Sequence, residues 1–589
     1  MSSKKFFNKT SIILSILIFI IIFITLGIPY TNWWFNGDDF HGIFLGFRAQ
    51  SLKDVFYFFY DGHTNQYIGP SNFNYNYTQK PDFMGAYYRP LYCVYLSIQY
   101  YLFGTNAYYY LLTNVFFHAI NTVVLFNIFL YFLNYFSAFL VALFFAFHPQ
   151  IGYRFGAIVN LHYYVNVMLI LLTILSFKKY LDSKKIIFNI LSCILFALSL
   201  LTRESSIVLP IIIFLGTYLY ENKFNNLNFK NFFSKFFYNL KITSGLFITL
   251  ISFLITRAIL YPINLHAVSP ASISIKKIIF SKFPQVQVFI YDLFGLSWLP
   301  WGHKTLRAII IVSIFSLLTW LFIKNSKKIY FLYFLICTFL MLWPGIISYY
   351  SPRYFYEVAP FALIMFIFLF KFYSGKLIFF KNIFLIFLSF FICFLIFFDI
   401  HCFLRREKKM QILAQATQKL TQNLEIKNRA LCFLAHPLDG FGDHPADIFW
   451  ILFNNKNKET PIYCDNSAVL FQADSNIVKT TKWANIVSKY YSKNYFTITN
   501  IKTGTKNIFK FSSLNSNKII FFPEYIESSL GQKIITKTEK INNTQVTTEF
   551  TLEIKEKYLK TNPVFIAWDY ENKEFKILDS SSINKSKIS

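Results

Sequence analysis

The chain is poor in charged residues, which make up only 15% of its 589 positions, against about 25% in soluble domains. Hydrophobic residues make up 55%, and they include 75 Phe and 40 Tyr. This composition excludes an ordinary soluble protein and predicts an integral membrane protein. A net charge of +28 would suggest a nucleic-acid partner in a soluble chain, but here it must first be divided between the two sides of a membrane. We therefore expect a lipid bilayer, and no nucleic acid, as a partner.

Cysteine motifs are also missing. The spacing of the seven cysteines fits neither a metal site nor a disulfide framework. Only Cys432 and Cys464 lie in a polar region, where they can pair if that region is extracytoplasmic. Most of the others lie in apolar segments: Cys93, Cys193, Cys337 and Cys393.

A signal-peptide cleavage site of small residues is absent after the first apolar run, residues 11–28. The run follows Lys4, Lys5 and Lys9, and it is long enough for a helix to cross about 30 Å of hydrocarbon. These features predict an uncleaved signal anchor with a cytoplasmic N-terminus.

Further apolar segments predict an all-α polytopic membrane protein with about eleven crossings. The expected membrane domain covers residues 1–400, and a soluble α+β domain follows at residues 401–589, where short apolar runs alternate with polar turns. An odd number of crossings places this second domain outside. The predicted crossings lie near residues 11–29, 110–133, 136–148, 163–177, 186–201, 205–220, 243–261, 305–323, 329–346, 357–370 and 382–400.

Lysines and arginines separate when these crossings alternate from a cytoplasmic N-terminus. The connections assigned to the inside carry lysines, as the positive-inside bias requires; they include Lys178, Lys179, Lys184, Lys185, Lys324, Lys327 and Lys328. The predicted location is the bacterial inner membrane. All arginines before residue 400 fall on or near the outer face: Arg48, Arg89, Arg154, Arg203, Arg257, Arg307 and Arg353.

Arginine binds phosphate and carboxylate groups in a planar, bidentate way that lysine does not. The outer arginines therefore suggest an anion site, although helix-end anchoring and internal salt bridges are the alternative reading. The outer connections are long, with a first loop over residues 30–90 and a second over 262–304. Long loops in compact domains are usually functional.

The first outer loop contains adjacent carboxylates, Asp38 and Asp39, which can serve as a catalytic base. The alternative is that they cap the following helix. Ionisable groups at a membrane boundary are costly unless they pair or line a wet cavity, so this one-sided set is a site hypothesis. The other outer polar residues are His41, Arg89, His148, Arg154, Arg203, Glu204, Arg257, Arg353 and Glu357.

The ordered motifs "NGDDF", "YRPL", "FHP", "LLTRESSIVLP" and "SPRYFYEVAP" resemble those of membrane glycosyltransferases of the GT-C fold. The likeness is greatest to protein O-mannosyltransferases and to the tetratricopeptide-repeat O-mannosyltransferases. It covers roughly residues 10 to 400. The tetratricopeptide repeats are missing here, so the acceptor of that branch cannot be carried over.

The resemblance implies a polyprenyl-phosphate sugar as donor and sometimes a divalent metal such as Mg or Mn. We expect a protein or a glycan as the acceptor. It implies catalytic roles for Asp38 and Asp39. The residues expected to bind the donor phosphate are Arg89, Arg154, Arg203, Arg353 and Tyr354. The residues expected to support them are His148, Glu204, Arg257 and Glu357. We expect an inverting transfer, because no second carboxylate is marked as a nucleophile.

Several alternatives stay open. Arg203 and Glu204 can be a buried structural pair that holds helix ends together, and His148 can simply end its helix before Pro149. The loop containing His436, Asp439, Asp443, His444 and Asp447 mixes possible metal ligands, but loops rich in Gly, Pro and Asp look like this without a metal. A transporter or flippase of lipid-linked glycans and a non-catalytic membrane scaffold are the alternative functions.

Overall fold

A computed structural model describes the helical part of the chain and the strands of its C-terminal part. The described residues are 8–28, 31, 33–35, 39, 42, 43, 46, 52–60, 88–148, 151, 157–221, 232–260, 289, 290, 292, 293, 316, 322, 323, 328–347, 352–371, 378–423, 431–435, 462–464, 495–503, 506–514, 531–542, 545–554, 564–569 and 574–577.

The described residues are mostly helical. The α-helices are α1 (Lys9–Leu26), α3 (Leu52–Tyr60), α4 (Pro90–Phe103), α5 (Ala107–Phe129), α6 (Tyr135–Ala146), α8 (Leu161–Ser183), α9 (Ile186–Thr202), α10 (Leu209–Glu221), α11 (Phe232–Leu260), α14 (Lys328–Ile347), α15 (Phe355–Lys371) and α16 (Ile378–Asn423). Three short 3-10 helices are η5 (Ile158–Asn160), η6 (Glu204–Val208) and η10 (Pro352–Tyr354).

Local chemistry explains several helix boundaries. Asn8, Asn106 and Asn134 precede α1, α5 and α6, and each side-chain oxygen accepts a backbone N–H of the first turn. Asparagine is a preferred residue at this position because it satisfies a donor that the helix cannot. α4 ends at Gly104, whose φ of 52° favours glycine. α8 ends at Lys184, with a φ of 57°, and α9 starts two residues later.

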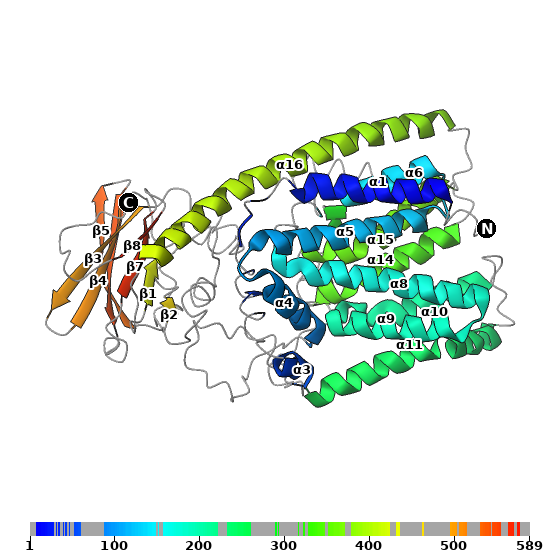
Figure 1. The fold of residues 1–589 in the computed structure, drawn as a ribbon, viewed down its shortest axis with the longest axis horizontal. Coiled ribbons are helices and arrows are strands. Elements are labelled where there is room, and N and C mark those ends of the chain that lie inside the picture. The colour runs from blue at the N-terminus through cyan, green and yellow to red at the C-terminus, as the bar shows by residue number, and fades with distance from the viewer. Residues whose placement is uncertain are drawn as a thin grey trace. The chain divides into compact units, whose positions relative to one another are not determined.

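The contacts divide the chain into two compact units. The first comprises Met1–Thr31, Ala49–Gln66 and Pro81–Arg405, and the second comprises Asn32–Arg48, Tyr67–Lys80 and Arg406–Ser589. In the first unit, α8 packs against α5, α9 and α15, and α14 packs against α10 and α15. Figure 1 shows these helices side by side along a common direction.

Four described helices are long and apolar enough to cross a membrane. They are Lys9–Leu26, Ala107–Phe129, Ile158–Ser183 and Phe233–Leu260. Six shorter apolar helices accompany them among the described residues, within α6, α9, η6–α10, α14, α15 and α16. These helices are compatible with the predicted membrane protein. Most of the segment predicted as a crossing over residues 305–323 lies outside the described part of the chain.

Charged residues lie at opposite ends of this bundle. At one end, the Lys178 ammonium is 2.6 Å from Asp182 near the end of α8, and the hydroxyl of Tyr220 donates to Asp182 across 2.9 Å from the end of α10. α8 and α9 form an antiparallel pair, so Arg203, directly after α9, lies at the other end. Lys178 and Arg203 therefore lie at opposite ends of the α8–α9 pair.

The C-terminal strands form two sheets within the second unit. β1 (Leu431–Ala435) pairs in parallel with β2 (Ile462–Cys464) and β7 (Val564–Asp569), and β7 pairs antiparallel with β8 (Glu574–Ile577). The other sheet is antiparallel, in the order β3-β4-β6-β5. Its strands are β3 (Tyr495–Thr503), β4 (Lys506–Leu514), β5 (Gly531–Asn542) and β6 (Gln545–Ile554).

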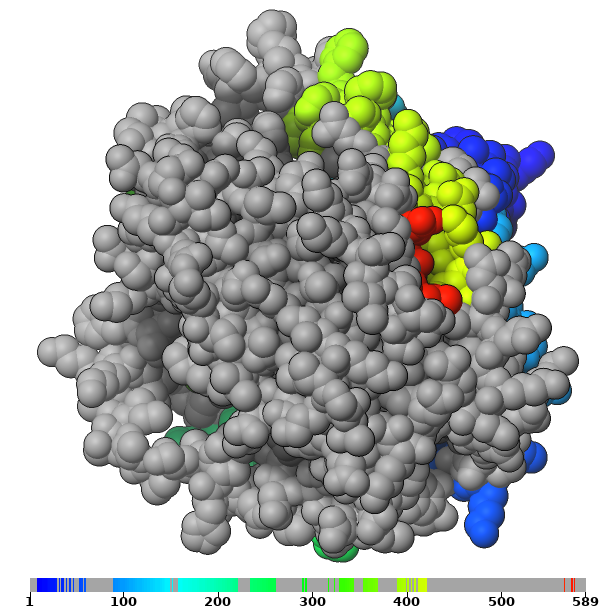
Figure 2. Space-filling model, turned by 90° about the vertical axis from the view of Figure 1, so that its left-hand side faces the viewer, coloured from blue at the N-terminus to red at the C-terminus, as the bar shows by residue number. Residues whose placement is uncertain are grey.

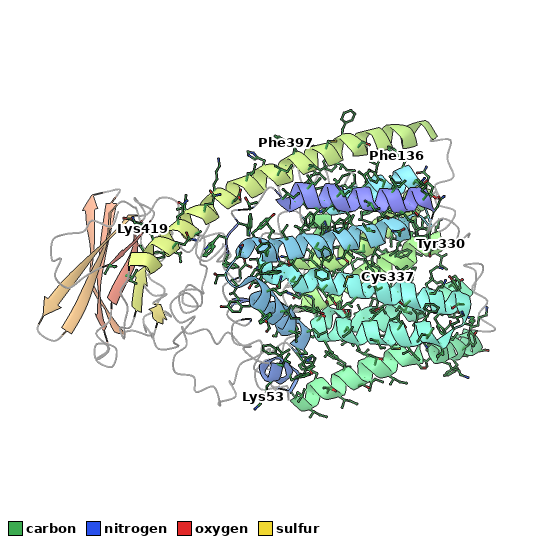
Figure 3. The ribbon with its side chains drawn as sticks, in the orientation of Figure 1. Lys53, Phe136, Tyr330, Cys337, Phe397 and Lys419 are labelled. Atoms are coloured by element: carbon green, nitrogen blue, oxygen red, sulfur yellow. The ribbon has the colours of Figure 1, made fainter. Side chains whose placement is uncertain are left out.

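The C-terminal part of α16 belongs to this second unit and shows a helical apolar face. Leu413, Ala416, Thr417 and Leu420 are buried at the spacing of one helix stripe. Lys419 of α16 forms an ion pair with Glu574 of β8 (Figure 3). Atoms of the last strands lie against α16 in the space-filling view (Figure 2). Sequence reasoning predicted a crossing over 382–400 and a separate soluble domain from residue 401, whereas in the structure the single helix α16 runs across that boundary.

The contact between α10 and α14 depends on a glycine. A Cβ added at Gly216 would lie 2.5 Å from the hydroxyl of Tyr333, and this hydroxyl is held by a 3.0 Å hydrogen bond to the Ile212 carbonyl. We expect Gly216→Ala to destabilise the protein by about 1–3 kcal/mol through overpacking. Thermal unfolding in detergent measures the effect. Tyr333→Phe removes the obstructing atom, so Gly216→Ala should cost clearly less in that background; an equal cost in both backgrounds would contradict the packing.

Candidate functional site

The arginine end of the bundle brings together residues from several helix termini. His162 lies in the first turn of α8, Arg203 follows α9, and Arg353 lies in η10 before α15. Arg89 immediately precedes α4. Arg89, Arg203 and Arg353 all lie within electrostatic range of the His162 ring. Three of the arginines predicted to bind phosphate therefore converge on one histidine.

Arg203 is the most deeply buried of these arginines, with 1% of its surface exposed. Its Nε lies 2.9 Å from Oε1 of Glu357, in the first turn of α15, and also donates to the Ser205 hydroxyl at 3.2 Å. Its Nη1 donates to Nε2 of His162 at 2.9 Å. The Nδ1–H of His162 donates to the Val159 carbonyl at 2.7 Å. This assigns the neutral tautomer that accepts from the guanidinium.

Two tyrosine rings flank the Arg203 guanidinium. Its Cζ lies 3.8 Å from the ring centre of Tyr163 and 4.5 Å from that of Tyr354. The two rings are perpendicular, with an interplanar angle of 89°. Cation–π attraction is strongest when the cation is desolvated. Tyr354, predicted as a phosphate-binding residue, thus contacts Arg203 through its ring.

The Glu357 carboxylate is held mainly through one oxygen. Its Oε1 forms the ion pair with Arg203 and accepts hydrogen bonds from the Ser205 hydroxyl at 2.9 Å and from the Asn166 amide at 2.7 Å. The amide oxygen of Asn166 in turn accepts from Ser199 and Ser206. Oε2 of Glu357 is buried and has no hydrogen-bond partner among the described residues. An unmet buried acceptor costs about 1–3 kcal/mol, which marks this carboxylate as strained or functional.

Glu204 pairs with a different arginine from its neighbour Arg203. Its Oε2 lies 2.7 Å from Nε of Arg89, and its Oε1 accepts the backbone N–H of Tyr88 at 2.9 Å. Burial acts to raise the pKa of the Glu204 carboxyl, but Arg89, with Arg257, holds this pKa below its ordinary value. Arg257 lies in the last turn of α11, and its Nε is buried without a partner among the described residues.

His148 packs against the start of α15. Its ring stacks on Phe355 at 4.7 Å and donates to the Leu293 carbonyl. Asp292, next to Leu293, is completely buried. This carboxylate was not among the predicted site residues.

Several predicted residues lie outside the described part of the chain or in the other compact unit. Asp38, His41 and Arg154 lie outside the described residues, as does the loop with His436, Asp439, Asp443, His444 and Asp447. Asp39 is buried and belongs to the second compact unit. Among the residues that the structure does describe, no three His, Cys, Asp or Glu side chains gather as metal ligands.

A second buried polar network lies farther inside the bundle. The Tyr356 hydroxyl is 2.9 Å from Nδ1 of His118 and accepts from the Asn121 amide at 3.0 Å. Nε2 of His118 lies 3.2 Å from the Ala146 carbonyl, and the Asn121 amide also donates to the Tyr164 carbonyl at 2.8 Å. These bonds tie α5 to α6, α8 and α15.

Sequence reasoning missed His162, Asn166 and the residues of this second network. The sequence contains a signal that could have identified them, because polar residues recur at helical spacing within its apolar segments. His162 and Asn166 are four residues apart, as are Asn114 and His118. Buried polar side chains at such positions are rare in membrane helices and mark interhelical contacts or sites.

Neither models of known protein families nor the sequences of curated proteins match this chain.

The Glu204–Arg89 pair predicts a pH-dependent contribution to stability. Because the folded-state pKa of Glu204 is lowered from 4.5, the stabilisation is present above that value and is lost as the pH falls through the folded-state pKa. We expect Glu204→Gln to lower the melting temperature at pH 7, with the difference from wild type shrinking below about pH 4.5. Melting curves between pH 3.5 and 7.5 measure it. Arg89→Met should shift the melting temperature in parallel, and a pH-independent difference would contradict the ion pair.

Proposed function

We propose that the protein is a membrane glycosyltransferase that moves a sugar from a polyprenyl-phosphate donor to an acceptor protein or glycan. The gathering of Arg89, Arg203 and Arg353 at the start of α4, the end of α9 and η10, with the Arg203 guanidinium donating to His162, carries this proposal. Clustered guanidinium groups at helix ends suit an anionic lipid headgroup, because they supply planar, directed donors. The apolar helices supply the surroundings that a polyprenyl chain requires.

The proposed reaction is a single displacement that inverts the anomeric carbon. Asp38 or Asp39 takes the proton of the acceptor hydroxyl, whose oxygen forms the new bond to the anomeric carbon. The bond from that carbon to the phosphate oxygen breaks, and its electron pair leaves with the polyprenyl phosphate. Arginine side chains stabilise the charge that develops on the departing phosphate.

The proposal includes a topology of about eleven crossings, with the arginine end and a C-terminal α+β domain on the extracytoplasmic side. The lysines at the opposite end support this orientation through the positive-inside bias. The C-terminal domain is proposed to act in acceptor selection. The support for this role is the proposed placement of the domain on the extracytoplasmic side, where the acceptor would be.

Removing a proposed phosphate ligand should weaken donor binding. Arg353 is partly exposed, so we expect Arg353→Met to raise the Kd for a short-chain polyprenyl phosphate by about tenfold, the effect of one charged hydrogen bond. Binding to the detergent-solubilised protein can be measured by thermal shift or fluorescence titration. Lys178→Met, at the other end of the bundle, is the matched control and should leave the Kd unchanged. Equal binding by wild type and Arg353→Met would exclude this role for Arg353.

The proposed base can be tested with isosteric variants. We expect at least one of Asp38→Asn and Asp39→Asn, made separately, to abolish sugar transfer in membranes supplied with labelled polyprenyl-phosphate sugar, because an amide cannot accept the proton. Both variants should insert into the membrane and bind polyprenyl phosphate like the wild type. Full transfer activity in both would remove the acid pair from the mechanism.

A further inference from the structure

Arg203 and Glu204 are neighbours in the chain, but they hold different parts of the fold. Arg203 reaches Glu357 and the ring of Tyr354, on the segment that carries Arg353. Glu204 reaches the guanidinium of Arg89 and the backbone before α4. One dipeptide at the end of α9 therefore fixes the two segments that bear Arg89 and Arg353.

The arginines also differ in exposure. Arg203 is 1% exposed and is surrounded by Glu357, His162 and two tyrosine rings. The Arg89 side chain is 13% exposed, and Arg353 is also only partly buried. An anionic headgroup can reach Arg89 and Arg353 without breaking the buried pair, whereas reaching Arg203 would require dismantling it.

We infer that Arg203 is a positioning residue that acts on the donor phosphate through Arg353. This assignment deepens the proposed function and rests on it. The guanidinium contacts the ring of Tyr354, the residue directly after Arg353, and pairs with Glu357 in the first turn of α15. It therefore sets where the η10 backbone presents Arg353. A lysine at position 203 can keep the charge toward Glu357, but it lacks the planar group that fits between Tyr163 and Tyr354.

The test separates stability from positioning with a double-mutant cycle. Arg203→Met alone leaves Glu357 buried without its countercharge and should lower the melting temperature strongly. Combining it with Glu357→Gln removes both charges while keeping an acceptor for Ser205 and Asn166, so the melting temperature should recover. Arg203→Lys provides a second variant in which the ion pair persists. Binding of farnesyl phosphate is then measured for each variant with and without Arg353→Met.

A positioning role predicts non-additive effects, because both changes act on the same contact. The Arg203→Met/Glu357→Gln protein should bind farnesyl phosphate about tenfold more weakly than wild type. Adding Arg353→Met should weaken binding no further than Arg353→Met does alone, and Arg203→Lys should follow the same pattern.

Two outcomes in the variants would overturn the inference. Multiplicative losses, near a hundredfold when two independent tenfold effects combine, would make Arg203 a direct phosphate ligand. If the Arg203→Met/Glu357→Gln protein recovers its melting temperature and binds farnesyl phosphate with wild-type affinity, the role of Arg203 is purely structural. Failure of the proposed function gives a different result, because the wild-type protein would then not bind farnesyl phosphate. That result would overturn both the proposed function and this inference. The recovery of the melting temperature in the Arg203→Met/Glu357→Gln protein would still test the buried ion pair in that case.

Discussion

The buried ion pair between Arg203 and Glu357 is the interaction on which the arrangement of this end of the bundle depends. Taking two charges out of water costs several kcal/mol per ion, and the attraction offsets this only when the remaining hydrogen-bonding groups are also satisfied. Ser205, Asn166 and His162 supply hydrogen bonds to this pair, while Oε2 of Glu357 has no partner among the described residues. Because these partners come from the start of α8, the η6 segment and α15, the pair can form only when the three elements meet.

Arginine suits this position, and lysine suits the opposite end, for the same physical reason. A guanidinium is planar and weakly hydrated, so it can lie between Tyr163 and Tyr354 while donating in its own plane. An ammonium is a strongly hydrated point charge. Lys178, which pairs with Asp182, stays more than a third exposed, and such surface pairs contribute only about 0–1 kcal/mol. The buried cation, Arg203, is thus an arginine, and the hydrated cation, Lys178, is a lysine.

The sequence was enough to identify most members of the site but not their partners. Arg203, Glu204, Arg353, Tyr354 and Glu357 were predicted from short motifs, because ionisable residues stand out against apolar segments. The motif places Arg203 beside Glu204 and suggests that they act together. In the structure each pairs with a residue more than a hundred positions away, and only tertiary packing decides such a pairing. Hydrophobicity predicted the apolar helices, while the number of crossings stays a prediction. It did not predict the continuity of α16, because the character of this helix changes from apolar to amphipathic without a breaking residue.

The two buried polar networks differ in a way that bears on the mechanism. Around Tyr356, the hydroxyl and the His118 ring find partners on neighbouring helices, so this network is suited to joining helices within an apolar medium. Around Glu357, by contrast, the network holds full charges. Both networks contain a buried oxygen without a hydrogen-bond partner among the described residues, Oε2 of Glu357 and Oδ1 of Asn121. Burying these charges costs desolvation free energy. We interpret the buried pair as a means of holding the neighbouring arginines in fixed positions. A preorganised set of donors stabilises a departing phosphate without having to reorient during the reaction. The Arg203–Glu357 pair, which holds these helix ends together, therefore suits the proposed transfer chemistry.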